Sequence, residues 1–95
     1  MPICVLREQV ADYDAWRTGF YASLDANAAQ LQSAGVTLAA VYRDADDPNV
    51  VLTMIRFGSR EQGEAMLADP ASRAEMEANG VDLSTLRAEW YEDPS

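Results

Sequence analysis

The residues best suited to binding chemistry are two arginines that fall inside predicted strands. All 7 basic residues of the 95-residue chain are arginines, and lysine and histidine are absent. Arg7 and Arg56 each lie in a strand segment rather than on a helix surface. A guanidinium placed there can hold a phenolate or a carboxylate through paired hydrogen bonds. The alternative is a structural ion pair with an acidic residue of a neighbouring strand, Glu8 or Glu89.

Three aromatic residues complete the candidate substrate contacts. Tyr42 has a hydroxyl that can hydrogen-bond a substrate carbonyl or act as an acid, or the ring can simply pack on the sheet. Trp90 and Tyr21 are candidates to line an apolar pocket, and the alternative is that they belong to the core. The sequence singles out no catalytic residue. The candidates for substrate binding are Tyr42, Arg56, Trp90, Arg7 and Tyr21.

The absence of histidine and lysine excludes several kinds of site. A Ser-His-Asp triad or a Cys-His pair cannot be built without histidine. A Schiff-base lysine is excluded, and so is imidazole as a ligand of zinc or haem iron. Any general acid or base must therefore be Asp, Glu, Tyr, Cys or a bound water.

Two remaining features could suggest a metal or redox site, and neither has the required pattern. Asp44, Asp46 and Asp47 lack the glycine and the distal glutamate of a calcium loop, so we expect a solvated turn. Cys4 has no histidine neighbour to lower its pKa, so we expect an inert core thiol. We therefore expect neither a metal nor a cofactor.

Charge and cysteine content restrict the partners and the compartment. Sixteen acidic groups against 7 basic ones give a net charge of −9, which argues against nucleic acid and anionic membranes as partners. The amino terminus lacks the pattern of a signal peptide, and no apolar run is long enough to span a bilayer. With a single cysteine, these features lead us to expect a cytoplasmic protein.

The periodicity of apolar residues predicts a single domain over residues 1–95 with the order β-α-β-β-α-β. Strands are expected at 3–10, 37–43, 50–57 and 86–91, with a hairpin loop at 44–49. A long helix is expected at 13–34, with Asp12 or Asp14 as its N-cap and Gly35 just after its end. A second helical region starts at Ser59, restarts at Asp69-Pro70 and ends at Asn79-Gly80. This order predicts an α+β, ferredoxin-like fold, with a four-stranded antiparallel sheet and both helical regions on one face.

The strands are apolar on both faces, which predicts a second layer beyond the helices. Ile3 and Val5 alternate with Cys4 and Leu6, and the strand at 50–57 shows the same two-sided pattern. In the strand at 37–43, Leu38 and Ala40 are expected on one face and Thr37, Ala39 and Val41 on the other. Because helices on one side leave the other face uncovered, we expect a homodimer in which two sheets pack together.

Three stretches of the sequence resemble the dimeric α+β barrel superfamily over nearly the whole chain. They are Val10–Trp16, Val41–Asn49, and the helix entry Phe57-Gly58-Ser59 together with Asp69-Pro70 and Gly80-Val81. The superfamily includes antibiotic-biosynthesis monooxygenases and small aromatic polyketide cyclases. The resemblance implies two ferredoxin-like protomers whose sheets form a shared barrel. The matching stretches are helix starts, a hairpin and caps, which concern the fold rather than an activity.

The resemblance also implies a class of function. Haem-degrading and cyclase members commonly rely on histidine, which this chain lacks, so the quinone-forming, cofactor-independent monooxygenases are the better match. Those enzymes hold an electron-rich substrate that reacts with O2 once it is deprotonated. We therefore expect a cofactor-free, monooxygenase-like or cyclase-like enzyme acting on an aromatic or polyketide-type substrate.

A pocket for such a substrate is expected between the sheet and its helices or at the barrel end, larger than about 300 Å³. Its expected lining is Met54, Phe57, Met66 and Trp90, with Trp16, Phe20 and Tyr21 from the first helix. One alternative is a non-catalytic barrel that binds a small apolar or aromatic ligand, as in a stress response. Another alternative is a structural accessory subunit.

Overall fold

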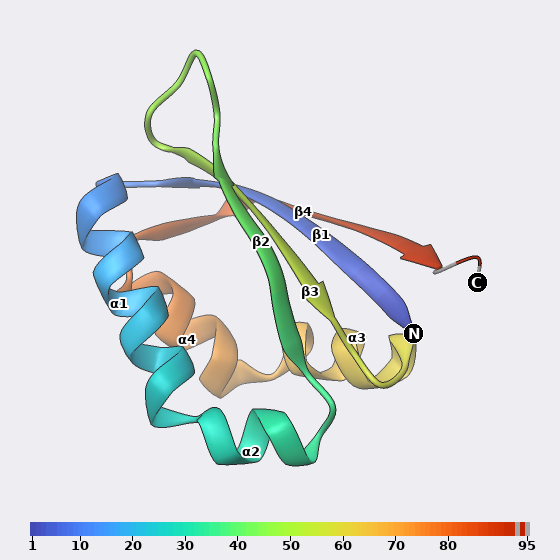
Figure 1. The fold of residues 1–95 in the computed structure, drawn as a ribbon. Helices are drawn as coiled ribbons and strands as arrows, with labels where there is room; N and C mark the ends of the chain where they lie inside the picture. Colours follow the sequence, from blue (N-terminus) through green and yellow to red (C-terminus); the bar gives the residue numbers. More distant parts are fainter. Residues whose placement is uncertain (93, 95) are drawn as a thin grey trace.

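The computed structural model describes residues 1–92 and 94, which form four strands and four helices (Figure 1). In chain order these are β1 (Pro2–Val10), α1 (Tyr13–Ala26), α2 (Ala28–Ser33), β2 (Thr37–Arg43), β3 (Val50–Arg56), α3 (Arg60–Ala68), α4 (Pro70–Ala78) and β4 (Val81–Glu92).

The strands form one antiparallel sheet in the order β2-β3-β1-β4. Figure 1 shows the helices on one side of this sheet, while the β2–β3 hairpin rises on the other side. We call the side without helices the open face. The ferredoxin-like α+β fold expected from the sequence is confirmed.

Predicted caps fix the helix ends. The Asp12 carboxylate accepts a hydrogen bond from the Ala15 amide at 2.9 Å, which starts α1. Ser59 caps α3 in the same way through the Gln62 amide at 3.1 Å. Gly35 and Gly80 follow helices with φ of 73° and 85°, a left-handed conformation that glycine adopts without strain.

The first helical region differs from the expected single helix at 13–34. Asn27 departs from helical geometry, with φ −109° and ψ 13°, and separates α1 from α2. Its side-chain amide donates to the Ser23 carbonyl at 2.8 Å. Asparagine competes for backbone hydrogen bonds in this way, so apolar periodicity across position 27 overestimated the helix length.

The last strand begins five residues before the predicted start at 86, at Val81. The polar residues Asp82, Ser84 and Thr85 have the composition of a loop, but they form a bulge inside β4. The Asp82 carboxylate accepts from the Ser84 amide at 3.0 Å, and the Gln9 amide donates to the Thr85 hydroxyl at 2.9 Å. These side-chain hydrogen bonds accompany a shift in the β1–β4 register between Arg7 and Gln9.

The two faces of the sheet have different environments. Facing the helices, two clusters of buried residues form the core, one around Cys4, Leu6, Val36 and Phe57 and the other around Val10, Trp16, Val51 and Val81. The open face includes Ile3, Val5, Leu52 and Met54, which are half-buried. A register shift at Ala39 pairs Ala40 with Met54 on the open face and Val41 with Thr53 on the helix side. The prediction that Leu38 and Ala40 share a face was therefore wrong.

Replacing Gly63 with alanine is expected to lower the free energy of unfolding by about 1–3 kcal/mol. A Cβ at Gly63 in α3 would lie 2.2 Å from Trp90 Cη2 and 3.0 Å from the Phe57 ring. These rings are packed together at 5.5 Å between centroids, so they have little room to move. The loss should therefore exceed the gain of about 1 kcal/mol that alanine brings to a helix interior.

Urea denaturation provides the measurement, and Gly19→Ala in α1 provides the matched control. The atoms nearest to a Cβ at Gly19 belong to the Asn79 side chain, which can rotate away. We expect the control to be neutral or stabilising. Equal unfolding free energies for the two variants would contradict the close packing of Gly63 against Trp90 and Phe57.

Candidate functional site

A partly open cavity of about 160 Å³ lies between the sheet and the helices α1, α3 and α4. Its lining is largely apolar and aromatic. From the sheet side come Leu6, Glu8, Thr53, Ile55, Phe57 and Val81, and from the helices come residues that include Trp16, Phe20, Ser23, Met66, Glu75, Met76 and Asn79.

Glu8 is the acidic residue that the sheet contributes to this cavity. Alternation in β1 places it on the same side as Leu6 and Val10, facing the helices, and only 7% of the residue is exposed. Burial raises the pKa of the Glu8 carboxyl from its ordinary value of 4.5 to about 7. Within residues 1–92 and 94 this carboxyl makes no hydrogen bond or ion pair. Glu8 can therefore accept or release a proton near neutral pH.

The helical side supplies aromatic surface and a few polar groups. Trp16 and Phe20 stack with 4.9 Å between ring centroids and 13° between their planes. The Ser23 hydroxyl of α1 donates to Glu75 Oε1 of α4 at 2.5 Å, which links the two helices beside the cavity. The cavity thus combines an apolar, aromatic wall with a carboxyl group on its floor.

The expected lining of a helix-side pocket is present in part. Trp16, Phe20, Phe57 and Met66 line the cavity as predicted. Met54 lies on the open face, because it pairs with Val5 in the β1–β3 register. The other two expected members are also outside the lining: Trp90 packs beside Phe57, and Tyr21 is 37% exposed on α1.

The five candidate substrate contacts do not meet in one place. Arg7 and Tyr42 both lie on the open face and flank Leu52, where they border a depression of about 250 Å³. Arg56 lies on the same face, opposite Ile3 and Thr37, toward the other end of β3. Trp90 and Tyr21 belong to neither group, because Trp90 faces α3 and Tyr21 contacts Arg17 at the surface of α1.

Glu8 was absent from the sequence candidates except as a partner for a strand arginine. The available signal was its position, because it is two residues after Leu6 and four after Cys4 on the buried side of a strand. A carboxyl group in such a position must either find a partner or change its pKa.

Cys4 and Asp44 also have shifted pKa values. Burial is the main influence on Cys4 and raises the pKa of its thiol to about 11, so the thiol stays protonated at neutral pH. Asp44 accepts hydrogen bonds from the amides of Asp46 and Asp47, which lowers its pKa and forms a turn. Among residues 1–92 and 94, no cluster of three acidic or cysteine residues could hold a metal ion. In the same range, no helix is long and apolar enough to cross a membrane.

Comparison with known proteins establishes a fold. No family model and no curated protein matches the chain. A candidate antibiotic biosynthesis monooxygenase from Deinococcus radiodurans is 19% identical, with a TM-score of 0.67 over 100% of this chain and 94% of its own. A variant of SnoaB, a cofactor-independent oxygenase from Streptomyces nogalater, is 15% identical, with a TM-score of 0.69 over 99% and 93%. An uncharacterised NIPSNAP domain protein from Burkholderia xenovorans is 10% identical, with a TM-score of 0.65 over 100% and 96%.

Proposed function

We propose that this chain, which has the fold of the monooxygenase-like dimeric α+β barrels, is a cofactor-independent small-molecule enzyme. It removes a proton from an electron-rich aromatic substrate. Glu8 is the base in this proposal. The observation behind it is the buried Glu8 carboxyl, with a pKa of about 7, on the floor of an apolar cavity. The likeness to a cofactor-independent oxygenase supports the choice of reaction class.

The reaction proposed is the conversion of a phenol to a para-quinone by O2. The Glu8 carboxylate accepts the phenol O–H proton, which makes the ring electron-rich enough to reduce O2 directly. One oxygen atom forms a bond to the ring carbon para to the hydroxyl, where a C–H bond is lost, and the other oxygen atom leaves as water. One phenol and one O2 thus give one quinone and one water. The two protons of the water are the phenol proton, which Glu8 returns, and the proton lost from the ring carbon.

The size of the cavity narrows the substrate class. A volume of about 160 Å³ is close to the roughly 150 Å³ of an apolar protein cavity that binds benzene. It is smaller than the pocket of more than about 300 Å³ expected for a polyketide-type substrate. We therefore propose a substrate with one aromatic ring, which Trp16 and Phe20 would contact from the helical side.

The open face supports the proposal of a homodimer. Ile3, Val5, Leu52 and Met54 form a half-buried apolar patch with no helix over it. Packing two such faces together removes this surface from water. The transfer contributes about 25 cal/mol for each Å² of apolar area buried, and the entropy lost on association offsets part of it. In that dimer Arg7, Tyr42 and Arg56 lie between the two sheets. The depression of about 250 Å³ beside Arg7 and Tyr42 is then a second place for a ligand.

Binding and oxygen uptake test the proposed function. Wild-type protein is expected to bind 3-methoxyphenol saturably with quenching of tryptophan fluorescence, because Trp16 lines the cavity. It should consume one O2 per phenol, and 1-naphthol, with two fused rings, should bind more weakly. Saturable binding without oxygen uptake would overturn the enzyme and support a ligand-binding barrel. No binding of either phenol would overturn both.

A further inference from the structure

We infer that, in the proposed homodimer, the β2–β3 hairpin of each protomer docks on the open face of its partner, with Asp46 paired to the partner's Arg87. The inference depends on the proposed dimer but not on the proposed reaction. Its occupant is a second copy of this chain, because the same protomer presents both the arginine face and the acidic hairpin.

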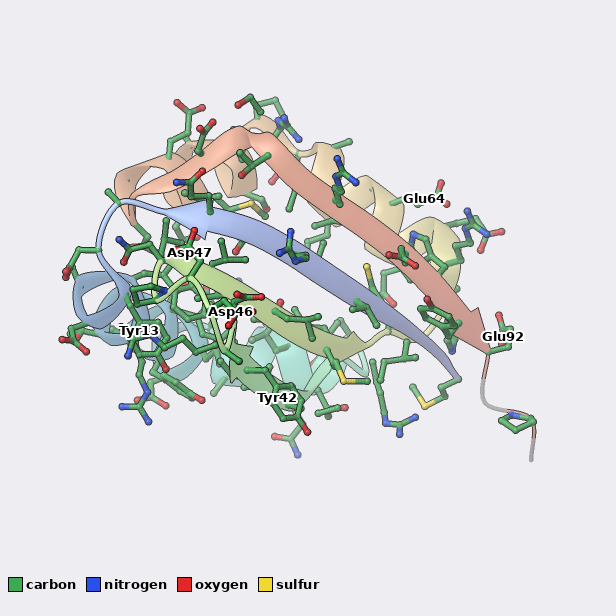
Figure 2. The ribbon with its side chains drawn as sticks, turned by 90° about the horizontal axis from the view of Figure 1, so that it is seen from above. Tyr13, Tyr42, Asp46, Asp47, Glu64 and Glu92 are labelled. Atoms are coloured by element: carbon green, nitrogen blue, oxygen red, sulfur yellow. The ribbon has the colours of Figure 1, made fainter. Side chains whose placement is uncertain are left out.

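The hairpin, residues 44–49, projects on the side that the second sheet would occupy. In Figure 1 it rises from the sheet in the direction away from the helices, and Figure 2 looks down on this open face with Asp46 and Asp47 above the sheet. A protein packed on the open face would therefore meet the hairpin tip. The Asp46 carboxylate makes no hydrogen bond or ion pair within residues 1–92 and 94.

The hairpin holds its own shape without a partner. Asp44 Oδ2 accepts from the Asp46 and Asp47 amides at 3.0 and 2.8 Å, and Arg43 Nε donates to the Pro48 carbonyl at 2.8 Å. Because this backbone is already ordered, docking it costs little conformational entropy. The tip can therefore act as a rigid acidic projection.

The open face carries an exposed arginine, Arg87, beside a second arginine. Arg7 and Arg87 are directly opposite one another on β1 and β4, an arrangement in which like charges repel. Arg7 is 3.7 Å from Asp44 of its own hairpin, whereas Arg87 has no ion pair in the described part of the chain. The nearby Glu89 accepts a hydrogen bond from the Tyr91 hydroxyl at 2.7 Å. A carboxylate from a second protomer would therefore offset the repulsion between Arg87 and Arg7.

Two-fold symmetry makes these features complementary. In a symmetric dimer every contact occurs twice, so each hairpin would reach the partner's Arg87 while the apolar patches meet between them. The overall charge of −9 makes two copies repel, and placing an acidic tip beside an arginine offsets part of that repulsion. The open face, with three of the 7 arginines (Arg7, Arg56 and Arg87), is a favourable surface for such a tip.

Charge reversal on the full-length protein tests this pairing by sedimentation equilibrium at low salt. Arg87→Glu and Asp46→Arg are each expected to raise the dimer dissociation constant about tenfold, since each replaces two attractive contacts by repulsive ones. The double variant should return to within about threefold of wild type. Arg17→Glu, on the exposed side of α1, makes the same charge change as Arg87→Glu and should have little effect.

The outcomes distinguish the Asp46–Arg87 pairing from the homodimer itself. A dimeric wild type that Arg87→Glu leaves unchanged, or single losses that the double variant does not rescue, would overturn the pairing and leave the dimer intact. A monomeric wild type at micromolar concentration would overturn the dimer and the pairing together. Neither result bears on oxygen uptake, which is measured separately. Circular dichroism of each variant confirms that the fold is retained.

Discussion

Replacing Glu8 with glutamine is expected to lower turnover by a factor of about 10²–10⁴ and to stabilise the protein above neutral pH. Glutamine has nearly the shape of glutamate but cannot accept the substrate proton, and loss of a general base costs about 10²–10⁴-fold in rate. Wild-type turnover should rise with pH through the Glu8 pKa of about 7. The measurement is oxygen uptake with 3-methoxyphenol between pH 5 and 9.

The effect of Glu8 on stability follows from the direction of its pKa shift. The folded protein has a pKa of about 7 for this carboxyl, above the ordinary value of 4.5 that applies to the unfolded chain. The folded state therefore retains the proton more readily, so the contribution of Glu8 to wild-type stability decreases as pH rises from 4.5 to 7 and changes no further above that range. A shift of this size corresponds to about 3 kcal/mol.

Glu8→Gln removes this pH-dependent loss, so the variant should gain up to about 3 kcal/mol over wild type at pH 8 and nothing from this source at pH 4. Burial of the glutamine side-chain amide lowers the unfolding free energy of the variant by the same amount at every pH. The control is Glu64→Gln in α3, at an exposed position (Figure 2). Glu64 pairs with Arg60. Parallel pH–stability curves for wild type and Glu8→Gln would contradict the burial of a titrating carboxyl. Full turnover by Glu8→Gln together with its loss in Tyr42→Phe would move the site to the open face.

Replacing Trp16 with alanine is expected to cost about 3–5 kcal/mol of unfolding free energy, a large share of the roughly 5–15 kcal/mol typical of a domain. Trp16 is only 2% exposed and packs in one cluster with Val10, Val51 and Val81. Its removal also deprives Phe20 of its stacking partner. Thermal and urea denaturation provide the measurement.

Tyr21→Ala on the same helix is the matched control for Trp16→Ala. Tyr21 is 37% exposed and contacts only Phe20 and Arg17 among ring and cation partners in the described chain. We expect it to cost less than about 1 kcal/mol. Similar losses for the two variants would show that Trp16 is not the core residue that its burial indicates.

The sequence predicted most of the fold because its strongest signals are local and repeated. Caps at Asp12 and Ser59, glycines at positions 35 and 80, and apolar alternation in β1 and β3 all agree with the structure. The errors arise where side chains replace backbone partners. Asn27 ends α1 through its own amide, and Asp82 and Thr85 keep β4 continuous through a bulge. Composition alone does not reveal where a side chain takes the place of a backbone hydrogen-bond partner.

The candidate site was predicted less well, because a cavity depends on how the helices sit on the sheet. Trp16, Phe20, Phe57 and Met66 were expected around a pocket and surround it. The arginines attracted attention as the only basic side chains, yet Arg7 and Arg56 face away from the helices. Glu8 looked like an ion-pairing partner, and only its depth beneath α1 and α4 changes its chemistry.

The positions of the two register shifts bear on solubility. The central β1–β3 pairing is regular, whereas the β2–β3 and β1–β4 pairings, which involve the two edge strands, each contain an irregularity. An edge strand presents unpaired backbone amides and carbonyls that can recruit further chains into a growing fibril. A bulge interrupts that row and twists it away from a flat template. Both lateral borders of the sheet are therefore poor templates for edge-to-edge aggregation.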